Sequence, residues 1–302
     1  MASMDINLIE WMSQIPEKLW DTPLSKIAIP GSHDSFSNQL DPNSEIGPDA
    51  PPAIRLLGPV AKGILLKWSV TQTFNLKQQL MNGIRYFDFR VSSRNGTDQI
   101  HFIHNLYGTS VADGLDELIE FLDINKKEIV ILDFNHFYGM GDDHHIKFLE
   151  MLLEKCGEKL CMFVGMESLT LNMLWENGLQ IIIMYHNEIA KEMCQFWPGY
   201  TCKSHWAETT DMNNMFTFLD KVKHIENVNR FNVCQCVLTP NIGYILGNLN
   251  GSLLENIAKD VMPEAIRWVK QQRRGTSGVN IVTTDFIELG DFAKSVISLN
   301  FS

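Results

Sequence analysis

A histidine and an aspartate follow a short apolar run near the N-terminus and could take part in proton transfer. The run ends at the Pro-Gly pair of residues 30–31, which terminates a strand and turns the backbone, and Ser32, His33 and Asp34 follow. Because histidine titrates near neutrality, His33 beside a carboxylate and hydroxyls is a candidate proton carrier. The alternative is a capping cluster, in which Ser32 or Asp34 satisfies free N–H groups of a following helix and His33 is only exposed.

A second histidine and an arginine extend this pattern. His33 and His104 each end a predicted strand, which suggests a base and an acid that act on opposite sides of one reacting centre. Asp88 and Arg90 are two residues apart on a strand and therefore face the same way. An inward-facing arginine needs an anion, and its planar guanidinium matches the oxygens of a phosphate. The alternatives are a structural ion pair of Arg90 with Asp88 or Asp34 and, for the second histidine, a half-buried strand position.

Composition and charge exclude several classes of protein. The chain has 302 residues, 45% of them hydrophobic, and a formal net charge of -11. This charge argues against nucleic acid as a partner and against recruitment to anionic membranes by charge alone. The six cysteines lack both a disulfide framework and zinc-ligand spacing, so we expect free thiols. We see no signal peptide and no apolar run near 20 residues, and we predict a cytoplasmic protein without a transmembrane segment.

Apolar strands alternate with helices along the chain, which predicts a parallel sheet covered on both faces. After the first run at 27–29, the predicted strands are 84–91, 101–104, 128–136, 160–164, 180–186, 233–238 and 278–285. Polar residues lie at the ends of many of these strands and are not confined to one crevice. This distribution favours a distorted (β/α)8 barrel of the TIM type over a doubly wound open sheet. We predict an α/β fold with one domain, in which an N-terminal helical segment (1–25) packs on a barrel (26–302).

Two segments outside the strands bear on how the protein is organised. Residues 6–19 have amphipathic spacing, which predicts a helix packed at the bottom of the fold. Segment 56–68 is apolar and carries lysines and a tryptophan. It is either an interfacial element that dips into a bilayer or a helix docked on the core.

Seven segments, in order, resemble the X domain of phosphatidylinositol-specific phospholipase C, and in particular the small eukaryotic proteins that consist of little else. They are 29–35 (IPGSHDS), 71–73 (TQT), 83–90 (GIRYFDFR), 102–104 (FIH), 128–136 (EIVILDFNH), 174–175 (LW) and 280–286 (NIVTTDF). The resemblance covers nearly the whole chain. It implies a distorted TIM-type barrel that cleaves the phosphodiester between diacylglycerol and an inositol phosphate headgroup.

The resemblance also implies roles for the residues noted above. His33 would be the general base that deprotonates the inositol 2-hydroxyl, and His104 the general acid that protonates the diacylglycerol oxygen. Arg90 would stabilise the charge that builds on phosphorus. The first product would be a cyclic inositol phosphate, which water then opens.

Three carboxylates would position this machinery. Asp34 and Asp88 would hold it by hydrogen bonds, and Asp285 on the last strand would set the tautomer of His33.

Calcium separates this sequence from one branch of the family. The calcium-dependent enzymes have Asn after the first catalytic histidine, a Glu-x-Asp pair and a later Glu, and the matching positions here are Asp34, Asp88-x-Arg90 and Asn135. A guanidinium repels a divalent cation and supplies part of its charge. We therefore expect chemistry without a metal or another cofactor.

Three uncharged strand-end residues are candidates for binding the substrate. Asn135 and Tyr185 fall near the places of the Lys and Arg that bind the headgroup in bacterial enzymes, and Gln235 ends a later strand.

The sequence thus predicts a calcium-independent phosphoinositide phosphodiesterase of lipid degradation and signal transduction, cytoplasmic and transiently bound to membranes through segment 56–68. One alternative is a glycerophosphodiester phosphodiesterase on the same barrel, although it needs an acidic metal cluster that Arg90 disturbs. The other is a phosphoinositide-binding or scaffolding protein with weak catalysis.

Overall fold

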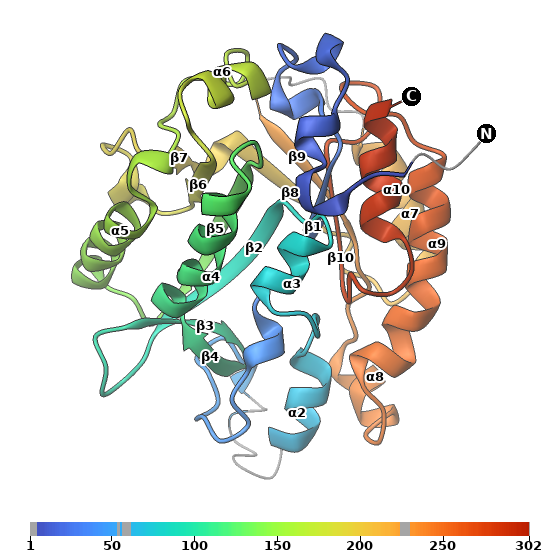
Figure 1. Ribbon diagram of the computed structural model, residues 1–302. Coiled ribbons are helices and arrows are strands. Elements are labelled where there is room, and N and C mark those ends of the chain that lie inside the picture. The colour runs from blue at the N-terminus through green and yellow to red at the C-terminus, as the bar shows by residue number, and fades with distance from the viewer. Residues whose placement is uncertain (1–4, 53–54, 56–61, 224–229, 302) are drawn as a thin grey trace.

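Eight parallel strands curl into a distorted TIM-type barrel in the computed structural model, which describes residues 5–52, 55, 62–223 and 230–301 (Figure 1). Around the barrel their order is β7-β6-β5-β2-β1-β10-β9-β8. Within these residues no ladder joins β7 to β8, so the barrel is open there. The barrel strands are β1 (Ile29–Ser32), β2 (Tyr86–Ser93), β5 (Val130–Tyr138), β6 (Ile181–Tyr185), β7 (Trp197–Pro198), β8 (Cys202–His205), β9 (Phe231–Cys236) and β10 (Ile281–Thr284).

Helices cover the outside of the barrel in two groups (Figure 1). One group packs on β2, β5 and β6 and contains α3 (Leu76–Met81), α4 (Val111–Ile124) and α5 (Asp142–Cys156). The other packs on β1, β9 and β10 and contains α7 (Met212–Val222), α9 (Lys259–Lys270) and α10 (Phe292–Ser298). The remaining helices are α2 (Lys62–Ser69), α6 (Leu171–Glu176) and α8 (Ile242–Gly247).

The two-residue period of the strands separates the barrel interior from the helix layer. On β2, Tyr86 belongs to the apolar cluster inside the barrel, and Phe87 and Phe89 belong to the cluster under α4 and α5. Gly31 on neighbouring β1 lies so close to Tyr86 that a Cβ atom there would be 2.7 Å from the ring. Glycine is therefore required at this position for the tyrosine to cross the interior.

The predicted helix over residues 6–19 is wrong, although the segment does pack at the bottom of the barrel. It forms three short 3-10 turns, η1 (Leu8–Glu10), η2 (Met12–Gln14) and η3 (Glu17–Leu19). Pro16 has no N–H group to donate within a helix, and it separates the last two turns. The Trp11 indole donates to the Gly83 carbonyl at 2.9 Å, which fixes the segment to the barrel.

The predicted strands also need correction at three places. The strand that carries His104, β3 (Ile100–His104), pairs antiparallel with β2 and with β4 (Leu106–Ser110), outside the barrel. The predicted strand 160–164 contributes only an isolated bridge of Leu160 with Ile181. The barrel instead uses β7 and β8, which have two and four residues and are too short to show a period.

Candidate active site

The carboxyl ends of the strands surround a cavity of about 940 Å³. All but one of the predicted site residues line it: His33, Asp34, Asp88, Arg90, His104, Asn135, Gln235 and Asp285. The barrel therefore brings together polar residues that are far apart in the sequence, as the distribution of strand ends predicted.

His33 and Asp285 lie side by side because β1 and β10 are parallel neighbours whose paired residues end at Ser32 and Thr284. The Nδ1 atom of His33 lies 2.7 Å from Oδ1 of Asp285. Burial opposes the charged imidazole, but the Asp34 and Asp285 carboxylates outweigh this effect and raise the pKa of His33 to about 9. With Nδ1 bound to Asp285, Nε2 is the nitrogen available to a reactant.

His104 approaches the same point from β3. Its Nδ1 atom lies 2.6 Å from the carbonyl oxygen of Ser69, at the end of α2. A carbonyl can only accept, so Nδ1 carries a hydrogen and Nε2 is free for proton transfer. Nε2 lies 3.3 Å from Oδ2 of Asp34, the oxygen that is also 3.4 Å from Nε2 of His33.

Asp34 pairs with Arg90, whose Nε atom lies 2.6 Å from Oδ1. Burial alone would raise the pKa of Asp34, but Arg90 and the two imidazoles hold it well below its usual range. The ion pair considered as an alternative role for Arg90 is therefore present. The same guanidinium also lines the cavity, where an anionic substrate can reach it.

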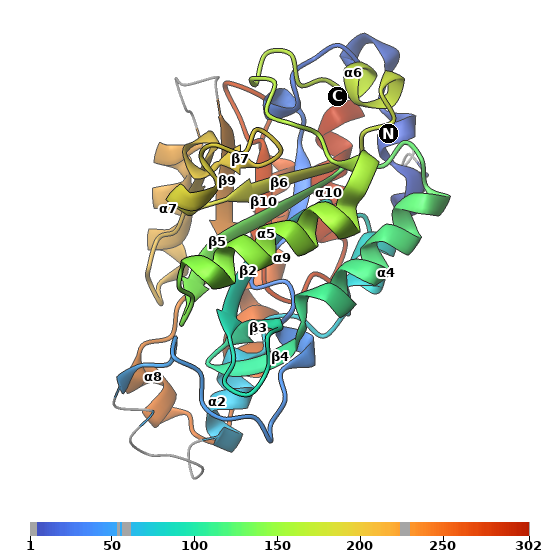
Figure 2. The same cartoon turned by 90° about the vertical axis from the view of Figure 1, so that its left-hand side faces the viewer.

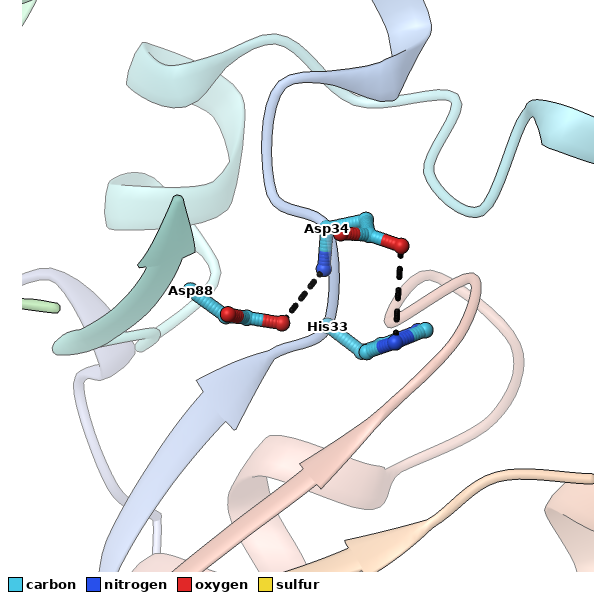
Figure 3. A group of neighbouring side chains, drawn as sticks. All are labelled: His33, Asp34 and Asp88. Atoms are coloured by element: carbon cyan, nitrogen blue, oxygen red, sulfur yellow. Dashed lines mark hydrogen bonds and ion pairs between the residues drawn. The ribbon is translucent and has the colours of Figure 1, made fainter. Parts of the chain in front are cut away.

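Asp88 and Asn135 support this group from β2 and β5. The backbone N–H of Asp34 donates to Oδ2 of Asp88 at 3.1 Å (Figure 3), and Nδ2 of Asn135 donates to Oδ1 at 2.6 Å. A β-bulge lies here, because the register passes from the Phe89–Phe134 pair to Arg90–His136. The bulge turns both Asn135 and His136 toward the cavity.

His33, Asp34 and Asp88 have potential metal-ligand atoms within 4.8 Å of one another (Figure 3). The surroundings of these atoms disfavour a calcium ion. Both Asp88 oxygens already accept hydrogen bonds, and the Arg90 guanidinium stands against Asp34. A divalent cation at this position would face that positive charge at short range.

The backbone is strained directly after three of the predicted catalytic residues. Positive φ angles occur at Asp34 after His33 (40°), at Asn105 after His104 (60°) and at Phe286 after Asp285 (49°). Non-glycine residues seldom adopt this conformation, and it concentrates at functional sites. Each turn takes the chain out of its strand immediately beyond a side chain that faces the cavity.

Tyr185 is the predicted site residue that the structure does not bring to the cavity. Its hydroxyl lies 2.6 Å from Nδ1 of His145 on α5, in the outer apolar layer. Because side chains alternate along β6, the following residue, His186, lines the cavity instead. Its Nε2 atom lies 2.7 Å from the fully buried Asp133, which outweighs the effect of burial and raises the pKa of His186. Counting the strand alternation from Ile182 and Met184 would have found His186.

The mouth of the cavity is apolar. Five exposed side chains line it and are called here the apolar rim: Tyr200, Trp206, Ile242, Leu246 and Leu249. Helices α2 and α8 lie beside each other at this end (Figure 2), where the rings of Trp68 and Tyr244 are 5.9 Å apart. Trp68 is only 6% exposed, so this end of segment 56–68 is docked on the protein, and residues 56–61 lie outside the described residues.

In the described part of the chain, none of the helices is both long and apolar enough to cross a membrane.

Curated relatives align with nearly the whole chain. It is 40% identical over 304 residues to human PI-PLC X domain-containing protein 3, covering 98% of this chain and 95% of the relative. It is 44% identical over 297 residues to the mouse PI-PLC X domain-containing protein 2, covering 96% and 87%. Identity to human PI-PLC X domain-containing protein 1 is 32% over 301 residues, covering 96% and 92%. No protein-family model matches the chain.

Solved bacterial structures share the fold. The phosphatidylinositol-specific phospholipase C of Listeria monocytogenes superimposes with a TM-score of 0.69 at 17% identity, covering 97% of this chain and 99% of that chain. The F249X mutant of the Staphylococcus aureus enzyme gives 0.70 at 18% identity, covering 97% and 98%. These similarities confirm the distorted TIM-type barrel.

Proposed function

This chain belongs to the family of PI-PLC X domain-containing proteins, and we propose that it cleaves the phosphodiester bond between diacylglycerol and the inositol phosphate headgroup of a phosphoinositide. One observation carries the proposal. The Nε2 atoms of His33 and His104 converge on the Asp34 carboxylate, which pairs with Arg90. A phosphate entering beside Arg90 would lie between a base and an acid.

The reaction follows from the tautomers of the two histidines. The base is the neutral form of His33, which a pKa of about 9 makes the minor form at neutral pH. With its Nδ1 hydrogen directed at Asp285, it removes the proton of the inositol 2-hydroxyl through Nε2, and that oxygen attacks phosphorus. The bond from phosphorus to the glycerol oxygen breaks as His104, which must enter this step as the imidazolium with hydrogens on both ring nitrogens, gives its Nε2 proton to that oxygen. The products are diacylglycerol and a cyclic inositol phosphate. Water then opens the ring, with the two histidines exchanging roles.

Charge stabilisation comes from the protein without a metal ion. The Arg90 guanidinium is fixed beside the reacting centre and stabilises the negative charge that builds on the phosphoryl oxygens. Oδ2 of Asp34 lies 3.3 Å from Nε2 of His104, on the side from which that proton is transferred. Arg90 thus takes the part that calcium has in the calcium-dependent branch of the family.

A lipid substrate reaches the cavity from a bilayer that the apolar rim contacts. The exposed side chains of the rim line the cavity that the headgroup enters. With a net charge of -11, attraction to anionic lipids does not supply the binding energy, so burial of apolar surface does. Asn135, Gln235 and His186 lie inside that mouth and are the proposed partners of the inositol hydroxyls.

The test is release of water-soluble inositol phosphate from labelled phosphatidylinositol vesicles in EDTA. We expect release by the wild type and a loss of about 10²- to 10⁴-fold in His33→Ala and in His104→Ala. His101→Ala is the matched control, because this histidine lies on β3 and does not line the cavity. It should keep wild-type activity.

Three outcomes would contradict parts of the proposal. Vesicle binding without release by the wild type would indicate a scaffolding protein. Release that depends on added calcium would refute the role of Arg90. Hydrolysis of glycerophosphoinositol or glycerophosphocholine in preference to the diacyl lipid would indicate a glycerophosphodiester phosphodiesterase.

A further inference from the structure

The side chain of Gln72 joins the two strand ends that carry His33 and Asp285. Its Nε2 atom donates to the carbonyl oxygen of His33 at 2.9 Å and to that of Thr284 at 3.0 Å. Its Oε1 atom accepts from the N–H of Ile287 at 3.2 Å. One fully buried amide thus uses both donors and its acceptor on the backbone directly after β1, at the last residue of β10 and in the segment after β10.

The hydrogen bonds of Gln72 lie just beyond the last hydrogen bonds between strands β1 and β10. The ladder of β1 and β10 ends at Ser32 and Thr284, with one more bond from the His33 N–H to the Thr284 carbonyl. Among the described residues, no further backbone hydrogen bond joins the segment after β1 to the segment after β10. His33 and Asp285 therefore project from a point where their two segments share no direct backbone hydrogen bond, so residues from elsewhere in the chain must hold them together.

The neighbouring residue, Thr71, completes the connection. Its carbonyl accepts from the N–H of Phe286 at 2.6 Å, and its hydroxyl lies 3.1 Å from the carbonyl oxygens of His33 and Asp34. Residues 71–72 thus form hydrogen bonds, through both backbone and side chains, with the ends of β1 and β10 and the residues that follow them. Gln72 itself does not line the cavity, so it cannot contact a substrate there.

We propose that Gln72 is a positioning residue, which holds the backbones of His33 and Asp285 together and so sets the 2.7 Å contact between Nδ1 and Oδ1. The catalytic consequence rests on the function proposed above, in which His33 is the base. The effect on the contact between His33 and Asp285 does not depend on that function, because it concerns only the distance between their side chains.

Loosening this contact has a predictable effect on the His33 ring. The charged groups that face the ring are Asp34, Asp88, Arg90 and Asp285. Asp285 makes the short contact, and its carboxylate favours the imidazolium. If Asp285 moves away, the pKa of His33 falls from about 9 toward its ordinary value.

Gln79 provides a matched control. It is also fully buried, and its Nε2 atom donates to two backbone carbonyls, of Ser35 at 2.7 Å and Phe74 at 2.8 Å. Neither of these bonds connects Gln79 to β10 or to the segment after it. Gln79→Met therefore removes the same groups from the same kind of environment without releasing Asp285.

The experiment compares Gln72→Met with Gln79→Met. The imidazole of His33 is titrated by NMR, with its signals assigned from their loss in His33→Gln, and kcat and KM are measured on phosphatidylinositol vesicles. We expect a lower His33 pKa in Gln72→Met only. The kcat of that variant should fall about 10- to 100-fold with KM unchanged, because the defect is in alignment and not in binding. Gln72→Asn, whose shorter amide reaches one strand end at most, should show an intermediate shift and replaces Gln72→Met if that protein does not fold.

An unchanged His33 titration in Gln72→Met or Gln72→Asn would overturn the inference, as would an equal shift in Gln79→Met. If the wild type releases no inositol phosphate but the His33 pKa still falls, the proposed function fails and the positioning role stands. If the wild type is active and the pKa does not move, the positioning role fails alone.

Discussion

Nε2 of His104 lies 3.3 Å from Oδ2 of Asp34. That oxygen is also within 3.4 Å of His33, so one carboxylate stands between the two imidazoles of the candidate site. Because Nδ1 of His104 is bound to a carbonyl, Nε2, which faces Asp34, is the nitrogen available for proton transfer. Because the proposed base, His33, and the proposed acid, His104, approach this carboxylate from different places, substitutions can test their roles separately.

The identity of the leaving group should distinguish the acid from the base. His104→Ala should lose about 10²- to 10⁴-fold in activity on phosphatidylinositol, because the diacylglycerol oxygen leaves only with a proton. On an inositol phosphodiester of p-nitrophenol, whose leaving group needs no proton, the loss should be far smaller. His33→Ala should be impaired equally on both substrates. Equal impairment of both variants on both substrates would refute the assignment.

The charge of His33 should make stability depend on pH. A histidine whose pKa is raised to about 9 in the folded state, from 6.5 when unfolded, stabilises the protein fully below pH 6.5. This contribution, of the order of 3 kcal/mol, is lost as pH rises through 9. The free energy of unfolding of the wild type minus that of His33→Gln should therefore decrease between pH 6.5 and 9.5. Urea denaturation at several pH values measures it, and a difference that stays constant would contradict the ion-pair geometry.

The apolar rim should control binding to vesicles. Ile242→Asp combined with Leu246→Asp removes two exposed apolar side chains and adds negative charge, so co-sedimentation with phosphatidylcholine–phosphatidylinositol vesicles should fall by about 10-fold or more. Ile124→Asp combined with Ile146→Asp changes two other exposed apolar side chains, which do not line the cavity, and should leave binding unchanged. Equal losses in the two double variants would argue against docking through the rim.

The ion pair at the bottom of the barrel should be important for stability. Glu128 and Arg85 are fully buried and 2.7 Å apart, and Glu128 also accepts from the N–H of Met12 at 3.1 Å. Glu128→Gln leaves a buried guanidinium without its counter-charge, so we expect a loss of about 3 kcal/mol or more in the free energy of unfolding. Glu120→Gln, in the exposed pair with Lys77, should cost less than about 1 kcal/mol. A loss below about 1 kcal/mol for Glu128→Gln would show that this contact does not anchor the N-terminal segment.

Local patterning was sufficient to predict much of the fold and the site. Continuous apolar strands such as β5 and β6 can be recognised from a few consecutive residues. Strand ends in a parallel barrel meet at one mouth, so His33, Arg90 and Asp285 could be grouped without coordinates.

Other features depend on contacts between distant residues and could not be read locally. Short β7 and β8 are strands only because neighbours supply their hydrogen bonds. Whether Tyr185 or His186 reaches the cavity depends on which face of β6 packs under α5, and the bulge at Asn135 exists only in register with β2. The role inferred for Gln72 comes from a single amide that bridges segments more than 200 positions apart, which no local period can reveal.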